Sequence, residues 1–107
     1  MSKRDPYFTY VIVRRDLNPN QRVIQVGHAV HLAARMNTDI EDTAPHMCLI
    51  GVDDERALLR EARALGKRGA KFALFYEPDN GGSFTALASI PLKGADRELF
   101  AEYQPLE

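Results

Sequence analysis

Apolar side chains recur along the chain with two different periods, and each period predicts one kind of secondary structure. Between residues 21 and 36 they recur every three or four positions, the spacing of a helix with one buried face. The other helical positions, among them Gln25 and His28, fall on different faces. The predicted buried stripe consists of Val23, Val26, Val30, Ala33 and Ala34.

Short apolar runs, rich in β-branched and aromatic residues, predict buried strands. These runs cover residues 10–13, 46–52, 72–76 and 84–90. Between the second and third runs the pattern predicts another helix, because aspartate caps helix starts and glycine ends helices. The expected cap is Asp53 or Asp54, and the expected end is Gly66 or Gly69.

The last third of the chain predicts a hairpin and a short final helix. Gly81 and Gly82 permit a tight reversal, so we expect the last two strands to be antiparallel neighbours. Residues 94–103 carry apolar side chains at helical spacing. The predicted order is therefore β-α-β-α-β-β-α, an α/β fold.

The length and the cysteine content limit the possibilities further. At 107 residues we expect a single domain over residues 1–107. Cys48 is the only cysteine, which excludes an intramolecular disulfide and a zinc site built on thiolates. Its apolar neighbours indicate a small core residue. We find no targeting signal and no apolar run near the ~20 residues of a membrane span, so a cytoplasmic setting is the expectation.

Positive charge is concentrated in the first third of the chain. Residues 1–36 hold six lysines and arginines against two acids, a net charge of +4, so the remainder carries −5. Such a split can give a nearly neutral molecule a basic face that attracts phosphate. An ordinary solvated surface is the alternative.

Charged residues follow the first predicted strand directly. Arg14, Arg15 and Asp16 lie at its carboxyl end, which is where open α/β sheets bind ligands. We expect Asn18 or Asn20 to cap the helix that follows. The positive end of the helix dipole favours an anionic ligand at this place.

Two motifs in this region resemble those of a known family. Residues 14–17 read Arg-Arg-Asp-Leu, and residues 25–29, on the first predicted helix, read Gln-Val-Gly-His-Ala. They resemble the R-x-D-L and Q-x-x-H-A signatures of the type 2 peptidyl-tRNA hydrolases. The likeness extends over roughly residues 8–104 in the same element order, and residues 85–88, Thr-Ala-Leu-Ala, match the family's T-x-L-A strand.

The resemblance implies a mixed four-stranded sheet with helices on both faces, commonly in a homodimer. It also implies hydrolysis of the ester that joins a peptide to the 3′-terminal ribose of tRNA, so tRNA is the expected partner. No metal and no other cofactor is expected in that reaction.

Two departures from the family's pattern bear on activity. The family usually carries lysines four and six residues before its Q-x-x-H-A motif, where this chain has Gln21 and Pro19. Arg22 supplies charge one residue away, but a guanidinium that stays protonated cannot act as a base. The loop of residues 77–83, Glu-Pro-Asp-Asn-Gly-Gly-Ser, is shorter than the family's loop and lacks its threonines. A divergent branch of the family has a similar Glu-Pro-x-Asn loop.

Ester hydrolysis needs a positioned water or nucleophile, a base that takes its proton, and donors for the developing oxyanion. Glu77 or Asp79 is the candidate base, and His28 is a second base or an orienting group. Asp16 is a further candidate catalytic carboxylate, unless it binds backbone amides at the turn between strand and helix. The candidate substrate-binding residues are Arg14, Arg15, Gln21, Arg22, Gln25, Arg35, Asn80 and Ser83.

These assignments have structural alternatives. His28 could hydrogen-bond a neighbouring backbone group, and residues 77–80 could form only a solvated turn. The arginines could pair with acids of the same chain instead of phosphates. The sequence therefore leaves two functions open. One is hydrolysis of peptidyl-tRNA or a related aminoacyl ester, and the other is a catalytically inactive module that binds tRNA or a protein partner.

Overall fold

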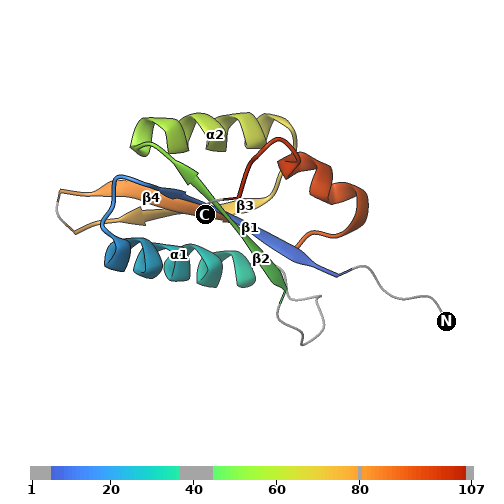
Figure 1. The fold of residues 1–107 in the computed structure, drawn as a ribbon, viewed down its shortest axis with the longest axis horizontal. Coiled ribbons are helices and arrows are strands. Elements are labelled where there is room, and N and C mark those ends of the chain that lie inside the picture. The colour runs from blue at the N-terminus through green and yellow to red at the C-terminus, as the bar shows by residue number, and fades with distance from the viewer. Residues whose placement is uncertain (1–5, 37–44, 80, 106–107) are drawn as a thin grey trace.

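The computed structural model describes residues 6–36, 45–79 and 81–105, and it contains the elements in the predicted order (Figure 1). The last of them is a 3₁₀ helix, η1. The elements are β1 (Phe8–Arg14), α1 (Pro19–Ala34), β2 (His46–Val52), α2 (Glu55–Lys67), β3 (Phe72–Glu77), β4 (Ser83–Ser89) and η1 (Gly94–Phe100).

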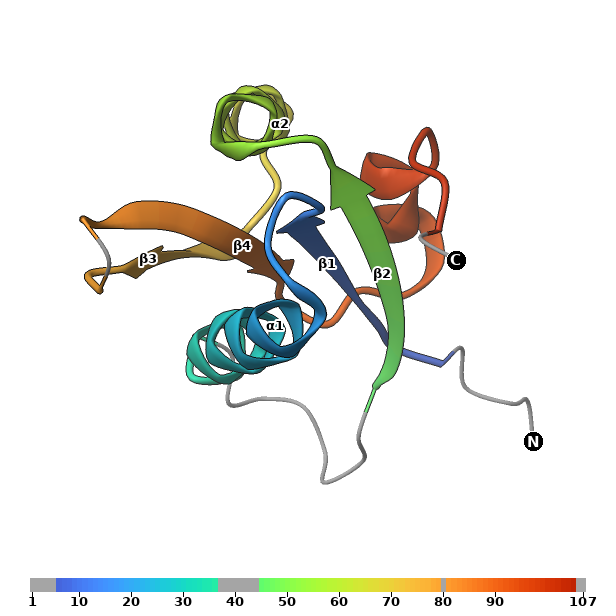
Figure 2. The ribbon, with the colours of Figure 1, turned by 60° about the vertical axis from the view of Figure 1, so that its left-hand side comes forward.

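The four strands form one mixed sheet in the order β2-β1-β4-β3. β1 and β2 are parallel, whereas β4 is antiparallel to both of its neighbours, so the predicted hairpin of β3 and β4 is confirmed. Gly81 and Gly82 in its turn have φ of 90° and 81°, a conformation that glycine adopts without strain. α1 covers one face of the sheet and α2 the other (Figures 1 and 2). The expected α/β class, with a mixed four-stranded sheet between helices, is confirmed.

Both α-helices begin at a side-chain cap among those predicted. Asn18 Oδ1 accepts a hydrogen bond from the N–H of Gln21 at 2.8 Å, and Pro19 opens α1. Asp54 Oδ1 accepts from the N–H of Ala57 at 2.9 Å. Each cap satisfies an N–H that has no partner within the helix. The starts of both helices are therefore fixed beside the carboxyl ends of β1 and β2.

The side of the sheet under α2 holds the larger core. Leu58 and Leu65 of α2 are fully buried in it. Phe100 of η1 is also buried and stacks on Tyr10 of β1, with ring centroids 4.7 Å apart. Cys48 packs against this cluster as a partly buried residue, in agreement with its interpretation as a core side chain.

The side under α1 is built from small residues. Ala29 and Ala33 of the helix are buried against alanines and valines of β1 and β4. Side chains of this size bring the backbone of α1 close to the sheet, because little volume separates them. The strand residues of this cluster are Val11, Val13, Ala86 and Ala88.

The buried stripe of α1 differs from the predicted one. Val23 is 73% exposed and Ala34 is also exposed, whereas Gln25 is only 5% exposed. The stripe that faces the sheet runs through Gln25, Ala29 and Ala33, at the four-residue spacing of one helix face. The prediction is confirmed at Ala33, which is buried, and at Val26 and Val30, which pack against the small-residue cluster, but it was wrong at Val23 and Ala34. It also missed Gln25, because hydrogen bonds allow a polar side chain to be buried there.

The final helix also differs from the prediction, since it has 3₁₀ form and ends at Phe100. Backbone bonds there join residues three apart, as from the N–H of Ala101 to the carbonyl of Glu98. So short an element has few internal bonds, and the burial of Phe100 holds it against the core. Within the three described ranges, no helix is both long and apolar enough to cross a membrane.

Candidate functional site

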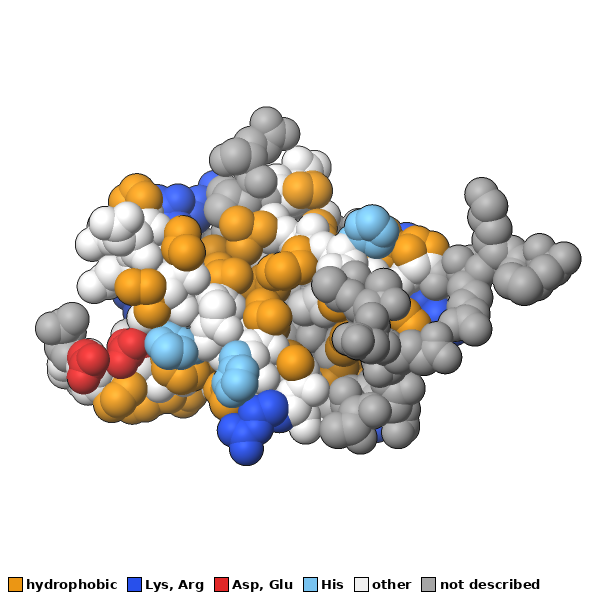
Figure 3. Space-filling model, turned by 90° about the horizontal axis from the view of Figure 1, so that it is seen from below, with side chains coloured by type: hydrophobic (Ala, Val, Ile, Leu, Met, Phe, Trp, Pro, Cys, Tyr) orange, Lys and Arg blue, Asp and Glu red, His pale blue; other side chains and the backbone are white. Residues whose placement is uncertain are grey.

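A groove of about 450 Å³ lies between α1 and the adjoining ends of β3 and β4. Seen from the α1 side, hydrophobic side chains cover much of this face, with histidines and acidic side chains among them (Figure 3). Most of the lining residues are candidates named from the sequence. The lining consists of Arg14, Leu17, Gln21, Ile24, Gln25, His28, Glu77, Asp79, Ser83 and Thr85. Another candidate, Asn80, lies outside the described residues.

Gln25 is held at the groove by hydrogen bonds at both atoms of its amide. The hydroxyl of Thr85 donates to Gln25 Oε1 at 2.8 Å, and Gln25 Nε2 donates to Glu77 Oε1 at 2.9 Å. Thr85 and Gln25 are 2% and 5% exposed, so water does not compete for the bond between them. An amide nitrogen carries two hydrogens, and among the described residues only one N–H of Gln25 has a partner.

An extra residue in β4 turns Thr85 toward this site. Phe75 and Tyr76 of β3 pair with Ala86 and Phe84 of β4, which leaves Thr85 between two consecutive pairs. Phe84 belongs to the α2 side and Ala86 to the α1 side. In a regular strand, side chains alternate between the two faces, so Phe84 and Ala86 would lie on the same face. Here they lie on opposite faces. The bulge resolves the conflict by placing Thr85 on the α1 side together with Ala86.

Glu77 lies at the groove as an ionised carboxylate. Its Oε1 accepts the hydrogen bond from Gln25, and its Oε2 accepts one from the backbone N–H of Asp79 at 3.3 Å. The hydrogen bond from Gln25, followed by the bond from Asp79 and the nearby charge of His28, lowers the pKa of the Glu77 carboxyl. A carboxylate with a lowered pKa is a weak proton acceptor. Glu77 is therefore better suited to orienting a partner and stabilising positive charge than to taking a proton.

His28 is positioned by stacking. Its imidazole lies against the ring of Phe75, with centroids 4.6 Å apart and an angle of 20° between the planes. Phe75 packs on the small-residue cluster under α1, so the plane of the imidazole is supported from β3. His28 is nevertheless exposed and lines the groove, which leaves its ring accessible to a substrate or a water.

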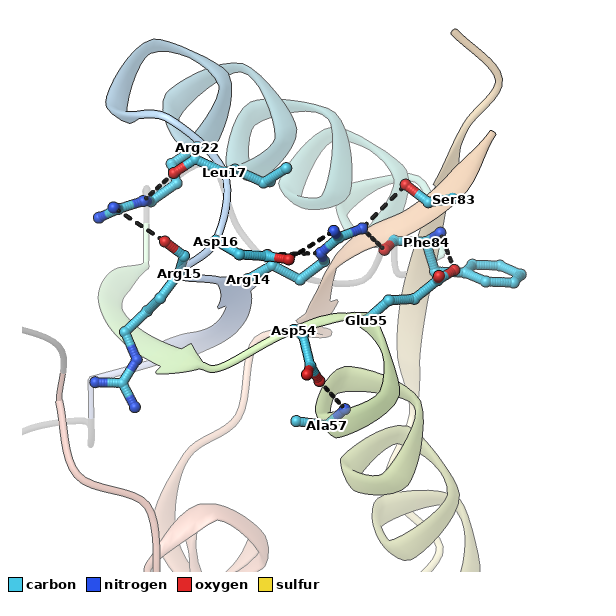
Figure 4. A network of polar contacts seen from close by, with 10 residues as sticks. All are labelled: Arg14, Arg15, Asp16, Leu17, Arg22, Asp54, Glu55, Ala57, Ser83 and Phe84. Carbon is cyan, nitrogen blue, oxygen red and sulfur yellow. Dashed lines mark hydrogen bonds and ion pairs between the residues drawn. The ribbon is translucent and has the colours of Figure 1, made fainter. Parts of the chain in front are cut away.

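Arg14 joins the end of β1 to the start of β4 (Figure 4). Its Nη1 donates to Ser83 Oγ at 3.0 Å and to the carbonyl of Phe84 at 3.1 Å. Its Nε and Nη2 donate to the two carboxylate oxygens of Asp16, each at 2.9 Å. A guanidinium has five N–H groups, and four of these are used here. Arg14 therefore forms a wall of the groove and offers little free charge to a ligand.

Asp16 does not line the groove. Its carboxylate binds the guanidinium of Arg14, where the sequence suggested backbone amides. The hydrogen bond and the positive charge of Arg14 lower the pKa of the Asp16 carboxyl. The role that this geometry supports is to hold Arg14 in place.

The other arginines named from the sequence also lie outside the groove lining. Arg22 donates to the carbonyl of Leu17 at 3.0 Å and to that of Arg15 at 3.2 Å, which ties down the loop before α1 (Figure 4). Arg15 lies 3.5 Å from Asp53 in an exposed ion pair. Arg35 follows the last turn of α1. The basic cluster expected near the start of α1 is thus used largely within the chain.

The lining also contains three residues that were not predicted as site residues from the sequence: Leu17, Ile24 and Thr85. Leu17 and Ile24 give the groove an apolar side. Ile24 is 53% exposed, and an apolar residue outside the buried stripe was the signal that could have revealed it. Thr85 belongs to the stretch that resembles the family's T-x-L-A strand, but the direction of its side chain depends on the bulge and could not be predicted. Among the described residues, no group of His, Cys, Asp or Glu side chains is arranged to hold a metal ion.

The fold is similar to that of a solved protein. A protein of unknown function from Agrobacterium tumefaciens matches with a TM-score of 0.66, over 95% of this chain and 98% of that one, at 10% sequence identity. At this identity the likeness concerns the fold alone. No family model matches the chain, and no curated protein matches it.

Proposed function

We propose that the protein hydrolyses the ester between a peptide or aminoacyl group and the 3′-terminal ribose of tRNA. The observation that carries the proposal is the groove, in which an accessible imidazole, a carboxylate and an oriented amide come together. These groups belong to His28, Glu77 and Gln25. The resemblance of residues 14–17 and 25–29 to type 2 peptidyl-tRNA hydrolase motifs supplies the substrate class, and the element order agrees with it.

His28 is the proposed general base. It takes a proton from the attacking water, which becomes the nucleophile at the ester carbonyl. The imidazole gains a positive charge in this step, and the ionised Glu77 nearby stabilises that charge. His28 can then return the proton to the leaving 3′ oxygen. The stack on Phe75 holds the ring in one plane throughout.

The developing oxyanion needs donors that are already in place. The second N–H of Gln25 is one such donor, since Thr85 and Glu77 fix the amide. The hydroxyl of Ser83 is another: its oxygen accepts from Arg14, which leaves its hydrogen for the substrate. This division of roles explains why the groove contains polar groups that are restrained by neighbours and do not react themselves.

One observation favours the alternative of a binding module without catalysis. The Glu77 carboxylate is bound at both oxygens, and its pKa is lowered, so it cannot serve well as the base that the sequence suggested. If neither His28 nor Asp79, the other candidate base in the lining, takes the proton, no candidate base remains among the described residues of the groove. In that case the same residues would bind the 3′ end of tRNA without cleaving the ester.

The test is the release of peptide from a labelled N-acyl-aminoacyl-tRNA. We expect His28→Ala to lower the rate by about 10²–10⁴-fold, the usual contribution of a general base. His31→Ala is the matched control, because His31 is exposed on the same helix and does not line the groove. Glu77→Gln keeps the shape of the side chain but removes its charge, and we expect an intermediate loss.

The outcomes separate the two functions. Turnover by the unaltered protein that is lost in His28→Ala and kept in His31→Ala would support hydrolysis. Absence of turnover with measurable tRNA binding would support the binding module. Equal turnover in all variants would contradict the assignment of this groove, because catalysis would then occur elsewhere.

A further inference from the structure

The exposed face of α2 carries a stripe of positive charge. Its members are spaced four, three and four residues apart, so they follow one face of the helix over about 16 Å. All of them are exposed, and within the described ranges no ion pair joins them to an acid. We call Arg56, Arg60, Arg63 and Lys67 the α2 stripe.

The two acidic residues of α2 have partners elsewhere. Glu55 Oε2 accepts the backbone N–H of Phe84 at 2.9 Å, and Glu61 Oε1 accepts the hydroxyl of Tyr103 at 2.6 Å. Each bond directs the carboxylate to a group outside the helix. The α2 stripe is therefore concentrated positive charge on a molecule whose formal net charge is −1. Charge of one sign in such a strip attracts a polyanion.

The surface beside the stripe is hollowed. A depression of about 600 Å³ is lined by Leu59 together with Glu55 and three members of the stripe. A linear polyanion can lie in this depression with arginines along it, and arginine binds phosphate oxygens through paired N–H donors.

An exposed aromatic ring lies near the start of the stripe. Tyr76 is 48% exposed and packs edge-on against Phe84, with centroids 5.0 Å apart. Phe84 is the residue whose N–H is bound by Glu55, so Tyr76 is close to the first turn of α2. Cations along a groove next to an accessible aromatic ring are the combination that binds single-stranded nucleic acid, through phosphates and base stacking.

The stripe and the groove lie on opposite faces of the sheet, and the start of β4 connects them. Ser83 lines the groove, and the next residue, Phe84, binds Glu55, which precedes Arg56 in α2 (Figure 4). We infer that the α2 stripe and Tyr76 bind the backbone and a base of a single-stranded RNA segment whose 3′ end enters the groove. The inference rests on the proposed function for the identity of this RNA as the unpaired end of tRNA. Binding of RNA to the α2 stripe does not require that an ester be cleaved.

The experiment measures binding of deacylated tRNA and of a 5′-labelled single-stranded RNA by fluorescence anisotropy at several salt concentrations. Arg60→Gln combined with Arg63→Gln should weaken binding on the order of tenfold and reduce the salt slope by about 0.7 for each phosphate contact removed. Lys93→Gln is the control for charge, because Lys93 is exposed near Tyr7 and outside the stripe. It should leave the slope unchanged.

A second pair of variants tests the aromatic ring. Tyr76→Ala should weaken binding of the single-stranded RNA about tenfold, whereas Tyr76→Phe keeps the ring and should bind as before. The inference is overturned if the unaltered protein does not bind RNA at low salt. It is also overturned if the double arginine variant binds as tightly as Lys93→Gln.

Deacylated tRNA carries no ester, so this result is independent of hydrolysis. Loss of binding in the double arginine variant, in a protein that shows no turnover, would support the stripe and refute the enzyme. Unchanged binding in that variant, in a protein that does turn over, would refute the stripe and leave the enzyme in place.

Discussion

The two faces of the sheet are built in opposite ways. Under α2, large side chains such as Leu58 and Leu65 fill the core and are completely buried. Under α1, the buried positions hold alanines and valines, and the same face includes a buried hydrogen bond between Gln25 and Thr85. Apolar burial stabilises a fold roughly in proportion to area, so the α2 side carries more of the stability.

The difference teaches where this chain can place polar groups. A close-packed core of large side chains has no room for an amide that must keep its hydrogen bonds. The small residues under α1 bring the helix near the sheet, so that Gln25 reaches both Thr85 and Glu77. The groove is formed on the face with the smaller core.

The largest difference between the faces should appear on removing a large core side chain. Leu58→Ala should lower the free energy of unfolding by about 2–5 kcal/mol, because it leaves a cavity in the α2 side. Val23→Ala on α1 is the control and should change it by less than about 0.5 kcal/mol, since Val23 is 73% exposed. Urea denaturation measures both. Equal losses in the two variants would contradict the assignment of Leu58 to the filled core under α2.

The buried hydrogen bond under α1 is tested by substitutions of Thr85. Thr85→Val keeps the shape but leaves Gln25 Oε1 buried without its donor, and we expect a loss of about 1–3 kcal/mol of unfolding free energy. The substitution should also reduce turnover or RNA binding, because the amide of Gln25 is no longer fixed. Thr85→Ser restores the hydroxyl and should recover ligand binding. A Thr85→Val protein as stable as the unaltered one would refute this role of the hydrogen bond.

The smallest effect concerns the ion pair beside the groove. Arg14 lowers the pKa of Asp16 in the folded protein, so the pair adds stability at neutral pH. That stability is lost as the pH falls below the ordinary aspartate value of about 3.9 and passes through the folded pKa. Asp16→Asn should therefore show a weaker loss of stability in acid than the unaltered protein. At pH 7 the two should differ by less than about 1 kcal/mol, because Asp16 is partly exposed.

The fold was predictable from the sequence because its helices and strands have clear hydrophobic periodicity and are bounded by recognisable cap and turn residues. Asp54 as a cap and the pair Gly81 and Gly82 as a turn each follow from local backbone chemistry, and the structure agrees. The burial of Gln25 did not follow, because its cost is met by partners 52 and 60 residues away in the sequence. Local periodicity contains no information about such partners.

The site was predictable in part for the same reason. The motifs bring His28 and Gln25 to one helix, and the loop residue Glu77 meets them at the groove. The arginines were harder to interpret, because a guanidinium can bind carbonyls of its own chain as well as phosphates. Arg22 does the former, and only the three-dimensional path of the loop before α1 shows it.

The extra residue in β4 has a consequence for comparing this protein with its relatives. Thr85 faces Gln25 only because one more residue lies in β4 than in the paired part of β3. In a homologue with one residue fewer at this point, the groove amide would have no hydroxyl beside it, even if its aligned motifs were identical. We therefore expect a homologue to share this groove only if it keeps both the length of this strand and the threonine at position 85.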